Sequence, residues 1–273
     1  MCFSDLALAR RLERAEGFAC AQFAAARRRA FPESGSEFAE FGGVYAAFDG
    51  KDAPTTQTFG LGLFEPVTDE TLSVIERFFF ERGASVDHEV SPLAGVEALN
   101  LLCARGYRPI EVSNVLWQPV HERQGQADTS IRVRVASAGE AEVWARTNTE
   151  GWTAEHPELR DFLLETGRVL TGREGSAAFL AELNGQPAAA GMLSLHEGVA
   201  LFAGSSTVPR FRGRGLQAAL LTERMRYARQ QGCDVAMVVT ETGSGSQRNA
   251  ERQGFRVAYT RIKWRLALGA AQA

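Results

Sequence analysis

Two stretches of the chain resemble each other and lie 148 positions apart. The segment "LLCARGYRPIEVSNVLW" closes the first half, and "RNAERQGFRVAYTRIKW" lies near the end of the second half. In each, a glycine (Gly106 and Gly254; 254 − 106 = 148) precedes an aromatic residue, an arginine and a strand-like run that reaches a tryptophan. Unless the resemblance is a coincidence, a repeat this long indicates a tandem duplication with two similar domains, because solenoid repeats are much shorter.

The segment between the two halves has the composition of a linker. Residues His121–Ser130 read "HERQGQADTS", which is polar and without periodicity. We therefore predict one domain over residues 1–120 and a second over residues 131–268. In a chain of 273 residues that is 45% hydrophobic, either half can bury a core of its own.

Charge and cysteine content narrow the class of protein. The formal net charge of −3 gives no overall attraction to nucleic acid or membrane, so any basic function must be local. The N-terminal segment mixes charged and apolar residues, unlike a signal peptide, and no apolar run approaches the ~20 residues of a membrane span. The four cysteines are widely spaced, which argues against a zinc site or a disulfide framework. We expect a cytoplasmic protein without bound metal and with mostly buried, free thiols.

Apolar periodicity and turn residues predict an α/β (α+β) architecture. Each half is expected to hold a mixed, mostly antiparallel central sheet flanked by helices. In the first half the expected helices are Ser4–Ala30, capped by Ser4, then Thr68–Gly83 and 92–106, followed by a long strand over 107–120. In the second half the expected helices are Ala138–Thr147, Pro157–Leu170, Arg214–Gln231 and Ser246–Gln253. Three strands between residues 176 and 208 are joined by turns at Asn184-Gly185 and His196–Gly198.

The strongest local signal is the stretch "STVPRFRGRGLQAALL", which joins a β-rich segment to an amphipathic helix. A helix N-terminus leaves about four backbone N–H groups unpaired and carries roughly half a positive charge, which suits a phosphate. Gly213 and Gly215 let an anion approach the backbone, and Arg210, Arg212 and Arg214 add positive charge. We predict a phosphate or pyrophosphate cradle here; the alternative is a solvated surface loop.

The stretch differs from two other phosphate-binding motifs. A P-loop requires a Gly-Lys pair, and the chain has none. A dinucleotide-binding turn requires G-x-G-x-x-G, and here the third position is Ala218. The weaker G-x-G-x-x-A variant fits, with Glu241 as the acidic residue that follows the next strand, so this alternative stays open.

The stretch "VPRFRGRGLQAALL" resembles the acetyl-CoA-binding motif of the GNAT N-acetyltransferase superfamily, and the order of elements from Ile131 to Leu266 is similar to that fold. The first half is similar in element order alone and so resembles a degenerate copy in a tandem GNAT arrangement. The resemblance implies an acetyl-CoA-dependent N-acetyltransferase, an acyltransferase that moves an acetyl group to the amine of a small-molecule or amino-acid-like acceptor.

The resemblance also implies which residues contact acetyl-CoA. Backbone groups at the end of a splayed strand would pair with the pantetheine amides, the arginine–glycine loop would wrap the pyrophosphate, and the short later helix would flank the thiol end. The residues so assigned are Thr207, Val208, Arg210, Arg212, Gly213, Arg214, Gly215, Leu216, Ser246 and Asn249.

The chain departs from the family pattern in two places. Many relatives carry a tyrosine that protonates the departing thiolate four residues before the Gly-Phe pair, where this chain has Ala250. Ser246, Tyr259 or a water are the remaining candidates for the general acid. The counterpart of the cradle in the first half, "FEPVTDETL", has no glycine and no basic residue, and its acidic side chains would repel phosphate. We expect this half to complete the fold and help wall the acceptor pocket.

Acetyl transfer requires a neutral amine, a positioned thioester and a stabilised oxyanion. A backbone N–H near Val208 is the candidate that polarises the thioester carbonyl. Glu241, at the end of the strand beside the splayed cleft, is the favoured general base. Further candidates are the pairs Glu155 with His156 and His196 with Glu197, and Trp152 is either an acceptor contact or a core residue.

Two alternatives belong to other functional classes. The absence of tyrosine at position 250 favours a non-catalytic acyl-CoA-binding or regulatory module. A nucleic-acid binder using the three cradle arginines usually has a wider basic face and stacking aromatics, which are missing here. We expect acetyl-CoA and a small amine as partners, no nucleic acid or membrane, and a monomer or homodimer.

Overall fold

The computed structural model describes residues 4–121, 130–153 and 157–269. The chain separates into two compact units, one built from residues 1–117 and 239–273 and the other from residues 118–238. The first of these is unit 1 and the second is unit 2. Both combine helices with a sheet that is mostly antiparallel, which confirms the predicted fold class.

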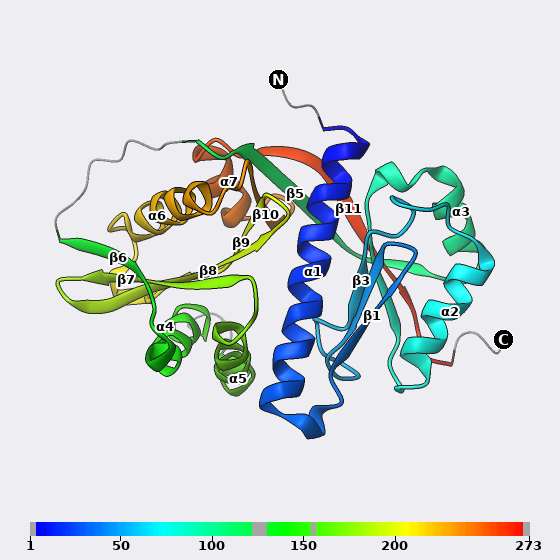
Figure 1. Cartoon of the computed structure of the whole chain (residues 1–273), viewed down its shortest axis with the longest axis horizontal. Coiled ribbons are helices and arrows are strands. Elements are labelled where there is room, and N and C mark those ends of the chain that lie inside the picture. Colours follow the sequence, from blue (N-terminus) through cyan, green and yellow to red (C-terminus); the bar gives the residue numbers. More distant parts are fainter. Residues whose placement is uncertain (1–3, 122–129, 154–156, 270–273) are drawn as a thin grey trace. The chain divides into compact units, whose positions relative to one another are not determined.

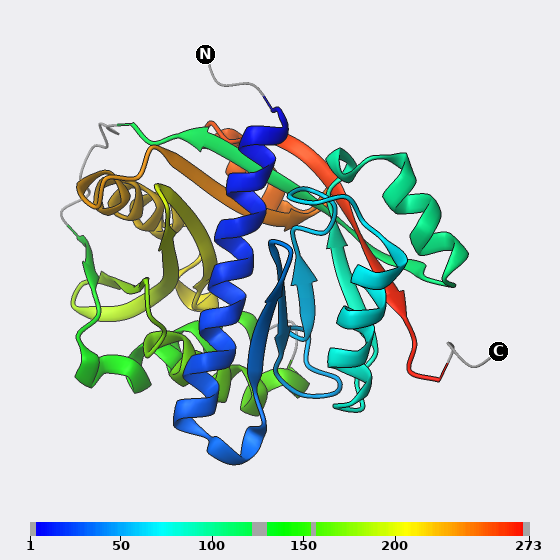
Figure 2. The same ribbon diagram turned by 45° about the vertical axis from the view of Figure 1, so that its right-hand side comes forward.

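In unit 1 the strands lie in the order β1-β2-β3-β4-β11-β5 (Figures 1 and 2). Its helices are α1 (Leu6–Ala30), α2 (Asp69–Phe80), α3 (Val96–Ala104) and α7 (Gly245–Arg252). Its strands are β1 (Glu37–Phe41), β2 (Val44–Phe48), β3 (Gln57–Phe59), β4 (Val86–Val90), β5 (Arg108–Pro119) and β11 (Arg256–Leu266). The last strand of the chain therefore lies among strands of the first half, where it pairs with both β4 and β5.

Both faces of this sheet are covered, as the completely buried β2 shows. On one face α1 lies against the sheet at Gly17, where a Cβ atom would come within 2.7 Å of Tyr45. On the other face the apolar side of α2 packs on alternate residues of β2 and on β4, because successive strand residues point to opposite faces. The main members of this core are Val44, Ala46, Phe48, Leu72, Ile75, Phe79, Val86, Leu102 and Leu266.

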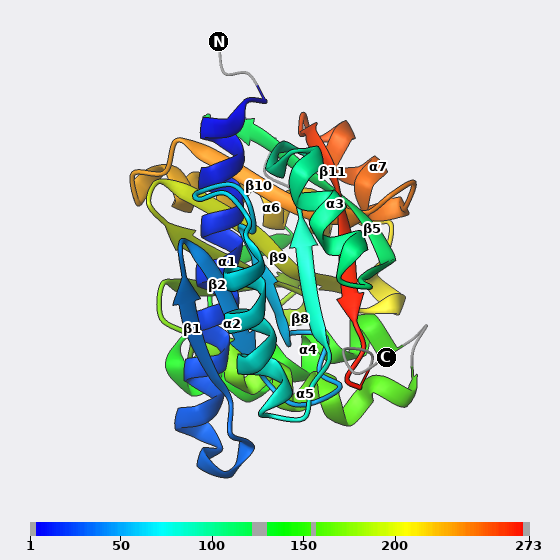
Figure 3. The same ribbon diagram turned by 90° about the vertical axis from the view of Figure 1, so that its right-hand side faces the viewer.

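Strand β5 pairs with β11 (Figure 3), and the register of this pairing has the symmetry of the sequence repeat. Ser113 pairs with Arg261, and these two residues are themselves 148 positions apart (261 − 113). The register skips Ile110 on one strand and Ala258 on the other, again 148 positions apart (258 − 110). At the ends of the ladder Arg108 pairs with Arg265 and Trp117 with Arg256. The offset of 148 positions exchanges these two pairs, because it relates residue 108 to residue 256 and residue 117 to residue 265. Equivalent strands of the repeat thus pair about a local two-fold axis through Ser113 and Arg261.

In unit 2 the strand order is β10-β9-β8-β7-β6, with β9 and β10 parallel and the other neighbours antiparallel. Its elements are β6 (Ile131–Val135), α4 (Ala141–Thr153), α5 (Arg160–Thr171), β7 (Ser176–Leu183), β8 (Gln186–His196), β9 (Val199–Thr207), α6 (Leu216–Gln230) and β10 (Val235–Glu241), the last of which ends beyond the unit boundary. The hairpin between β7 and β8 turns at Asn184 and Gly185, both with positive φ, as the Asn-Gly pair predicts.

The helices of unit 2 cover opposite faces of its sheet (Figure 1). Trp144 of α4 is fully buried on one face against Ala178, Leu180, Ala190 and Met192. The residues between them face α6: Phe179 contacts Tyr227, and Gly191 lies beside the guanidinium of Arg224. This alternation is what the period of a β-strand requires.

Several expected details need correction. Asp5 and not Ser4 caps the first helix, since its carboxylate accepts a hydrogen bond from the N–H of Leu8 at 2.9 Å. Of the described cysteines Cys233 is buried, whereas Cys20 is half-buried and Cys103 is exposed, so the thiols are not mostly buried as expected. Within the described ranges, no helix is long and apolar enough to cross a bilayer, and no group of acidic, histidine or cysteine side chains is arranged to hold a metal.

Candidate functional site

The loop before α6 has the geometry of an anion cradle in unit 2. Gly213 and Gly215 have φ values of 74° and 80°, a left-handed conformation that favours glycine. Gly215 is the N-cap of α6 and offers no side-chain hydrogen bond to the helix. The first main-chain bond runs from the N–H of Ala219 to the carbonyl of Gly215, so the N–H groups of residues 216–218 have no partner inside the helix. The exposed loop can therefore offer these groups to an anion.

The N-terminus of α2 in unit 1 differs from this cradle in two respects. The side chain of Thr68 caps α2 by accepting a hydrogen bond from the N–H of Thr71 at 3.1 Å. The first turn of α2 carries Asp69 and Glu70, whose charges oppose an anion. Of these two helix starts, the one in unit 2 is the one suited to phosphate.

The three arginines of the cradle are engaged to different degrees. Arg210 forms an ion pair with Glu150 of α4. Arg212 donates to the carbonyl of Gly151 at 3.0 Å and to that of Thr207 at 3.4 Å. Arg214 is exposed and makes no ion pair with another described residue. It is the arginine best placed to meet an incoming anion without first leaving a partner.

The end of β9 separates from β10. Their parallel pairing covers three positions, ending with Leu201 opposite Met237, while β9 continues to Thr207. The N–H of Val208 donates to the carbonyl of Ala188 at 2.9 Å, so it is used within the sheet and is not free to polarise a thioester as expected. Because strand residues alternate, the main-chain groups of Thr207 point away from β8, toward the edge that β10 has left.

A β-bulge interrupts β9 just before this end. Gly204 and Ser205 together lie opposite the single residue Gly191, and Gly204 has a φ of 55°. The carboxamide of Asn148 on α4 donates to the carbonyl of Gly204 at 2.6 Å. The hydroxyl of Ser206 donates to the main-chain carbonyl of Asn148 at 2.8 Å. The second half of α4 is thereby attached to the bulge.

Helix α4 extends to Thr153, beyond the predicted end at Thr147. The run "TNTEG" at 147–151 is poor in helix-forming residues, yet it lies inside α4. The structure explains two of its members: Asn148 bonds β9, and Gly151 leaves room for it, since a Cβ there would lie 2.4 Å from the hydroxyl oxygen of Ser206. Polar and small residues inside a helix therefore indicated a close contact between this helix and a neighbouring element.

Several predicted site residues belong to unit 1. Glu241 ends β10, and Ser246 and Asn249 lie on α7, all three with exposed side chains. The cap of α7 is Ser244, which accepts a hydrogen bond from the N–H of Gln247 at 3.1 Å. The carboxamide oxygen of Gln247 accepts a further bond from the side chain of Asn114 on β5 at 3.0 Å.

Tyr259, a predicted candidate for the general acid, is a buried residue of unit 1. Only 7% of it is exposed, and its hydroxyl donates to Glu13 of α1 at 2.8 Å. Burial raises the pKa of Tyr259 well above its ordinary value. These contacts give Tyr259 a structural role within unit 1 and leave Ser246 or a water as the candidates for the acid.

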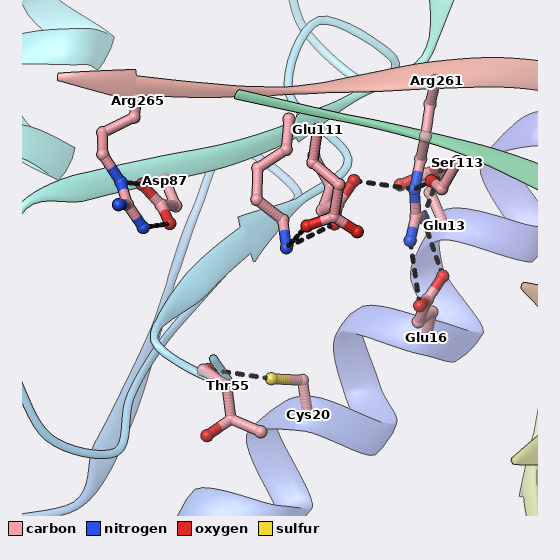
Figure 4. Close-up of polar contacts among 11 residues, drawn as sticks. Glu13, Glu16, Cys20, Thr55, Asp87, Glu111, Ser113, Arg261 and Arg265 are labelled. Atoms are coloured by element: carbon pink, nitrogen blue, oxygen red, sulfur yellow. Dashed lines mark hydrogen bonds and ion pairs between the residues drawn. The ribbon is translucent and has the colours of Figure 1, made fainter. Parts of the chain in front are cut away.

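Glu13, the partner of Tyr259, belongs to a buried ionic cluster around Arg261 (Figure 4). The Arg261 guanidinium is 2% exposed and lies 3.2 Å from Glu13, 2.7 Å from Glu16 and 2.9 Å from Glu89. Burial raises the pKa of Glu13 to about 7, and the positive charge of Arg261 opposes this shift.

The remaining candidates for the acceptor side of the site are two turn residues, an exposed tryptophan and two residues that the structure does not describe. His196 and Glu197 lie at the turn before β9, at the opposite end of that strand from the cradle, roughly 26 Å away at ~3.3 Å per residue. Trp152 is 45% exposed on α4, so it is not a core residue. Glu155 and His156 lie outside the described residues.

Comparison with known proteins now identifies part of the chain. The model of the Acetyltransferase (GNAT) family matches residues 141–255. This stretch is a GNAT domain. It includes α4, the bulged β9, the cradle and α7, so it begins in unit 2 and ends in unit 1.

Solved structures extend the likeness to the whole fold. A GCN5-related N-acetyltransferase from Kribbella flavida superposes with a TM-score of 0.61 at 18% identity, covering 90% of this chain and 95% of its own. A functionally unknown conserved protein from Staphylococcus epidermidis gives 0.58 at 8% identity, covering 88% and 97%. A tandem GNAT protein from the clavulanic acid biosynthesis pathway gives 0.55 at 14% identity, covering 73% and 69%. No curated relative matches the chain. The fold surrounding the GNAT domain is therefore also that of GNAT proteins.

Proposed function

We propose that this protein is an acetyl-CoA-dependent N-acetyltransferase that acetylates the amine of a small-molecule or amino-acid-like acceptor. The observation that carries the proposal is the uncapped, glycine-flanked start of α6, which exposes main-chain N–H groups beside Arg214. A pyrophosphate supplies the negative charge and the acceptor oxygens that such a cradle requires. Gly213, Gly215 and Leu216 would hold it through their backbone.

The chemistry places further demands on residues of the GNAT domain. The amine attacks the thioester carbon, the C–S bond breaks, and the departing thiolate needs a proton. Thr207 at the open edge of β9 would pair with a pantetheine amide. Ser246 and Asn249 would contact the thiol end, and Glu241 would accept the proton of the amine. In this proposal residues 131–268 form the catalytic repeat, and residues 1–120 form a degenerate copy without a cradle.

Thiol release from acetyl-CoA in the presence of a panel of amines tests the proposal. We expect amine-dependent release of free thiol, together with a rise in melting temperature on addition of CoA. A rise in melting temperature without thiol release for any amine would favour the second candidate, a non-catalytic acyl-CoA-binding protein. Ala250 in place of the usual tyrosine and the buried Tyr259 hydroxyl favour that candidate.

Removing the carboxylate that holds Arg210 should strengthen coenzyme binding. Glu150→Gln frees Arg210 for a phosphate, and an exposed ion pair of this kind contributes about 0–1 kcal/mol. We therefore expect CoA to bind about two- to fivefold more tightly, measured by titration calorimetry. The matched control is Glu142→Gln on the same helix, whose ion pairs are with Arg146 and Arg168 and which should leave the affinity unchanged. Weaker binding by Glu150→Gln would contradict the role assigned to Arg210.

A further inference from the structure

Asn148 contacts β9 on both sides of Ser205. It is 5% exposed, and its side chain holds the Gly204 carbonyl while its own carbonyl holds the Ser206 hydroxyl. Asparagine is an unfavourable residue inside a helix, because its side chain competes for backbone hydrogen bonds. The contacts of Asn148 with β9 therefore explain why asparagine lies at this position of the helix.

The segment that Asn148 holds has incomplete support from the sheet. A strand inside a sheet is normally bonded on both sides, but beyond Leu201 the register of β9 with β10 has ended. On the β8 side the bulge at Gly204 and Ser205 interrupts the ladder. The ladder with β8 resumes at Ser206, which pairs with Ala190, so Gly204 and Ser205 are the part of this segment that depends on α4 for a fixed path.

Two neighbours reinforce this attachment. Gly151, one turn further along α4, approaches so closely that a Cβ would lie 3.0 Å from the backbone nitrogen of Thr207. Gln217 of α6 donates to the hydroxyl of Thr207 at 2.8 Å. The path of β9 is thus fixed by α4 at the bulge and by α6 at the strand end.

We propose that Asn148 is a positioning residue for the pantetheine arm of the coenzyme, a role that rests on the proposed function. By fixing Gly204 and Ser205 it presents the open main-chain edge of β9 in a path that an extended chain of amides can pair with, as an added strand would. Asn148 bonds Gly204 and Ser206 of β9, whereas the contacts of α4 with the cradle arginines come from Glu150 and Gly151. The contribution of Asn148 is therefore specific to the arm.

This specificity can be measured with two ligands. CoA carries the pantetheine arm, and 3′-phospho-ADP is the same nucleotide without it. In Asn148→Asp, an isosteric change, an acceptor replaces the donor that faces the Gly204 carbonyl. We expect CoA to bind about tenfold more weakly to this variant, while 3′-phospho-ADP binds within about twofold of its original affinity. Hydrogen exchange of residues 204–207 should rise in the protein without ligand.

The matched control is Thr147→Val on the same helix. The Thr147 hydroxyl bonds only the carbonyl of Val143 in its own helix at 2.7 Å, so this variant should change neither affinity nor the exchange of residues 204–207. Ser206→Ala removes the second contact without adding charge and should reproduce a smaller loss of CoA affinity, which provides a test if Asn148→Asp fails to fold.

The outcomes separate this inference from the proposed function. Equal losses for both ligands, or no loss for either, would overturn the role of Asn148 and leave the cradle intact. The same holds if the unchanged protein binds both ligands equally well, since the arm then contributes nothing. If the unchanged protein binds neither ligand, the proposed function itself fails, and the inference fails with it.

Discussion

Gly213→Glu is expected to weaken CoA binding by at least about 100-fold. Gly213 has a φ of 74°, and a Cβ at this position would meet no other atom within 4 Å, so the fold tolerates a side chain at the cost of local strain. A carboxylate here would face the pyrophosphate, and two charges about 4 Å apart near a protein surface repel by ~4 kcal/mol before screening. Calorimetric titration with CoA measures the loss.

Gly213→Ala is the matched control for this prediction. Alanine meets the same backbone strain as glutamate but brings no charge, so we expect it to weaken CoA binding by no more than about tenfold. A difference between the two variants isolates the electrostatic part of the effect. Equal affinities for CoA in Gly213→Glu and the unchanged protein would place the coenzyme site away from the start of α6.

The second large effect is expected in unit 1. Arg261→Met leaves Glu13, Glu16 and Glu89 without the cation that they share, and breaking a buried ion pair in this way costs about 3–5 kcal/mol. Denaturant unfolding should show a loss of this size in the free energy of unfolding. Arg265→Met, on the same strand, breaks an ion pair with Asp87 whose arginine is 48% exposed, so it should cost about 1 kcal/mol or less.

The loss of unfolding free energy caused by Arg261→Met should also grow with pH. Burial already raises the pKa of Glu13 to about 7, and removing the positive charge of Arg261 raises it further. A carboxyl group whose pKa is raised by folding contributes its full stabilisation at pH values below its unfolded pKa near 4.5. This stabilisation is lost as the pH rises through the pKa of the group in the folded protein. We expect the loss at pH 8 to exceed that at pH 5. A deficit independent of pH would show that lost packing, and not unpaired carboxylates, dominates.

The sequence predicted those features that depend on neighbouring residues. The Asn184-Gly185 hairpin follows from the positive φ that both residues tolerate, and the left-handed turn before α6 follows from Gly213 and Gly215. The sequence repeat was visible because Gly106 and Gly254 precede strands of similar composition. The paired strands β5 and β11 carry the same offset in their register.

The features that escaped prediction depend on contacts between distant parts of the chain. Tyr259 is buried because its partner Glu13 lies 246 positions away, a distance over which no local pattern carries information. The bond from Asn148 to Gly204 spans 56 positions and depends on a bulge that the sequence does not mark beyond a glycine in a strand. The roles of Tyr259 and Asn148 became apparent only when the fold showed which distant residues they contact.

A crystal structure of the complex with CoA tests the central claim most directly. We expect pyrophosphate oxygens within hydrogen-bond distance of the backbone N–H groups that open α6, with Arg214 turned toward them. Coenzyme bound at the start of α2, or at any other place with the loop between β9 and α6 unliganded, would contradict it.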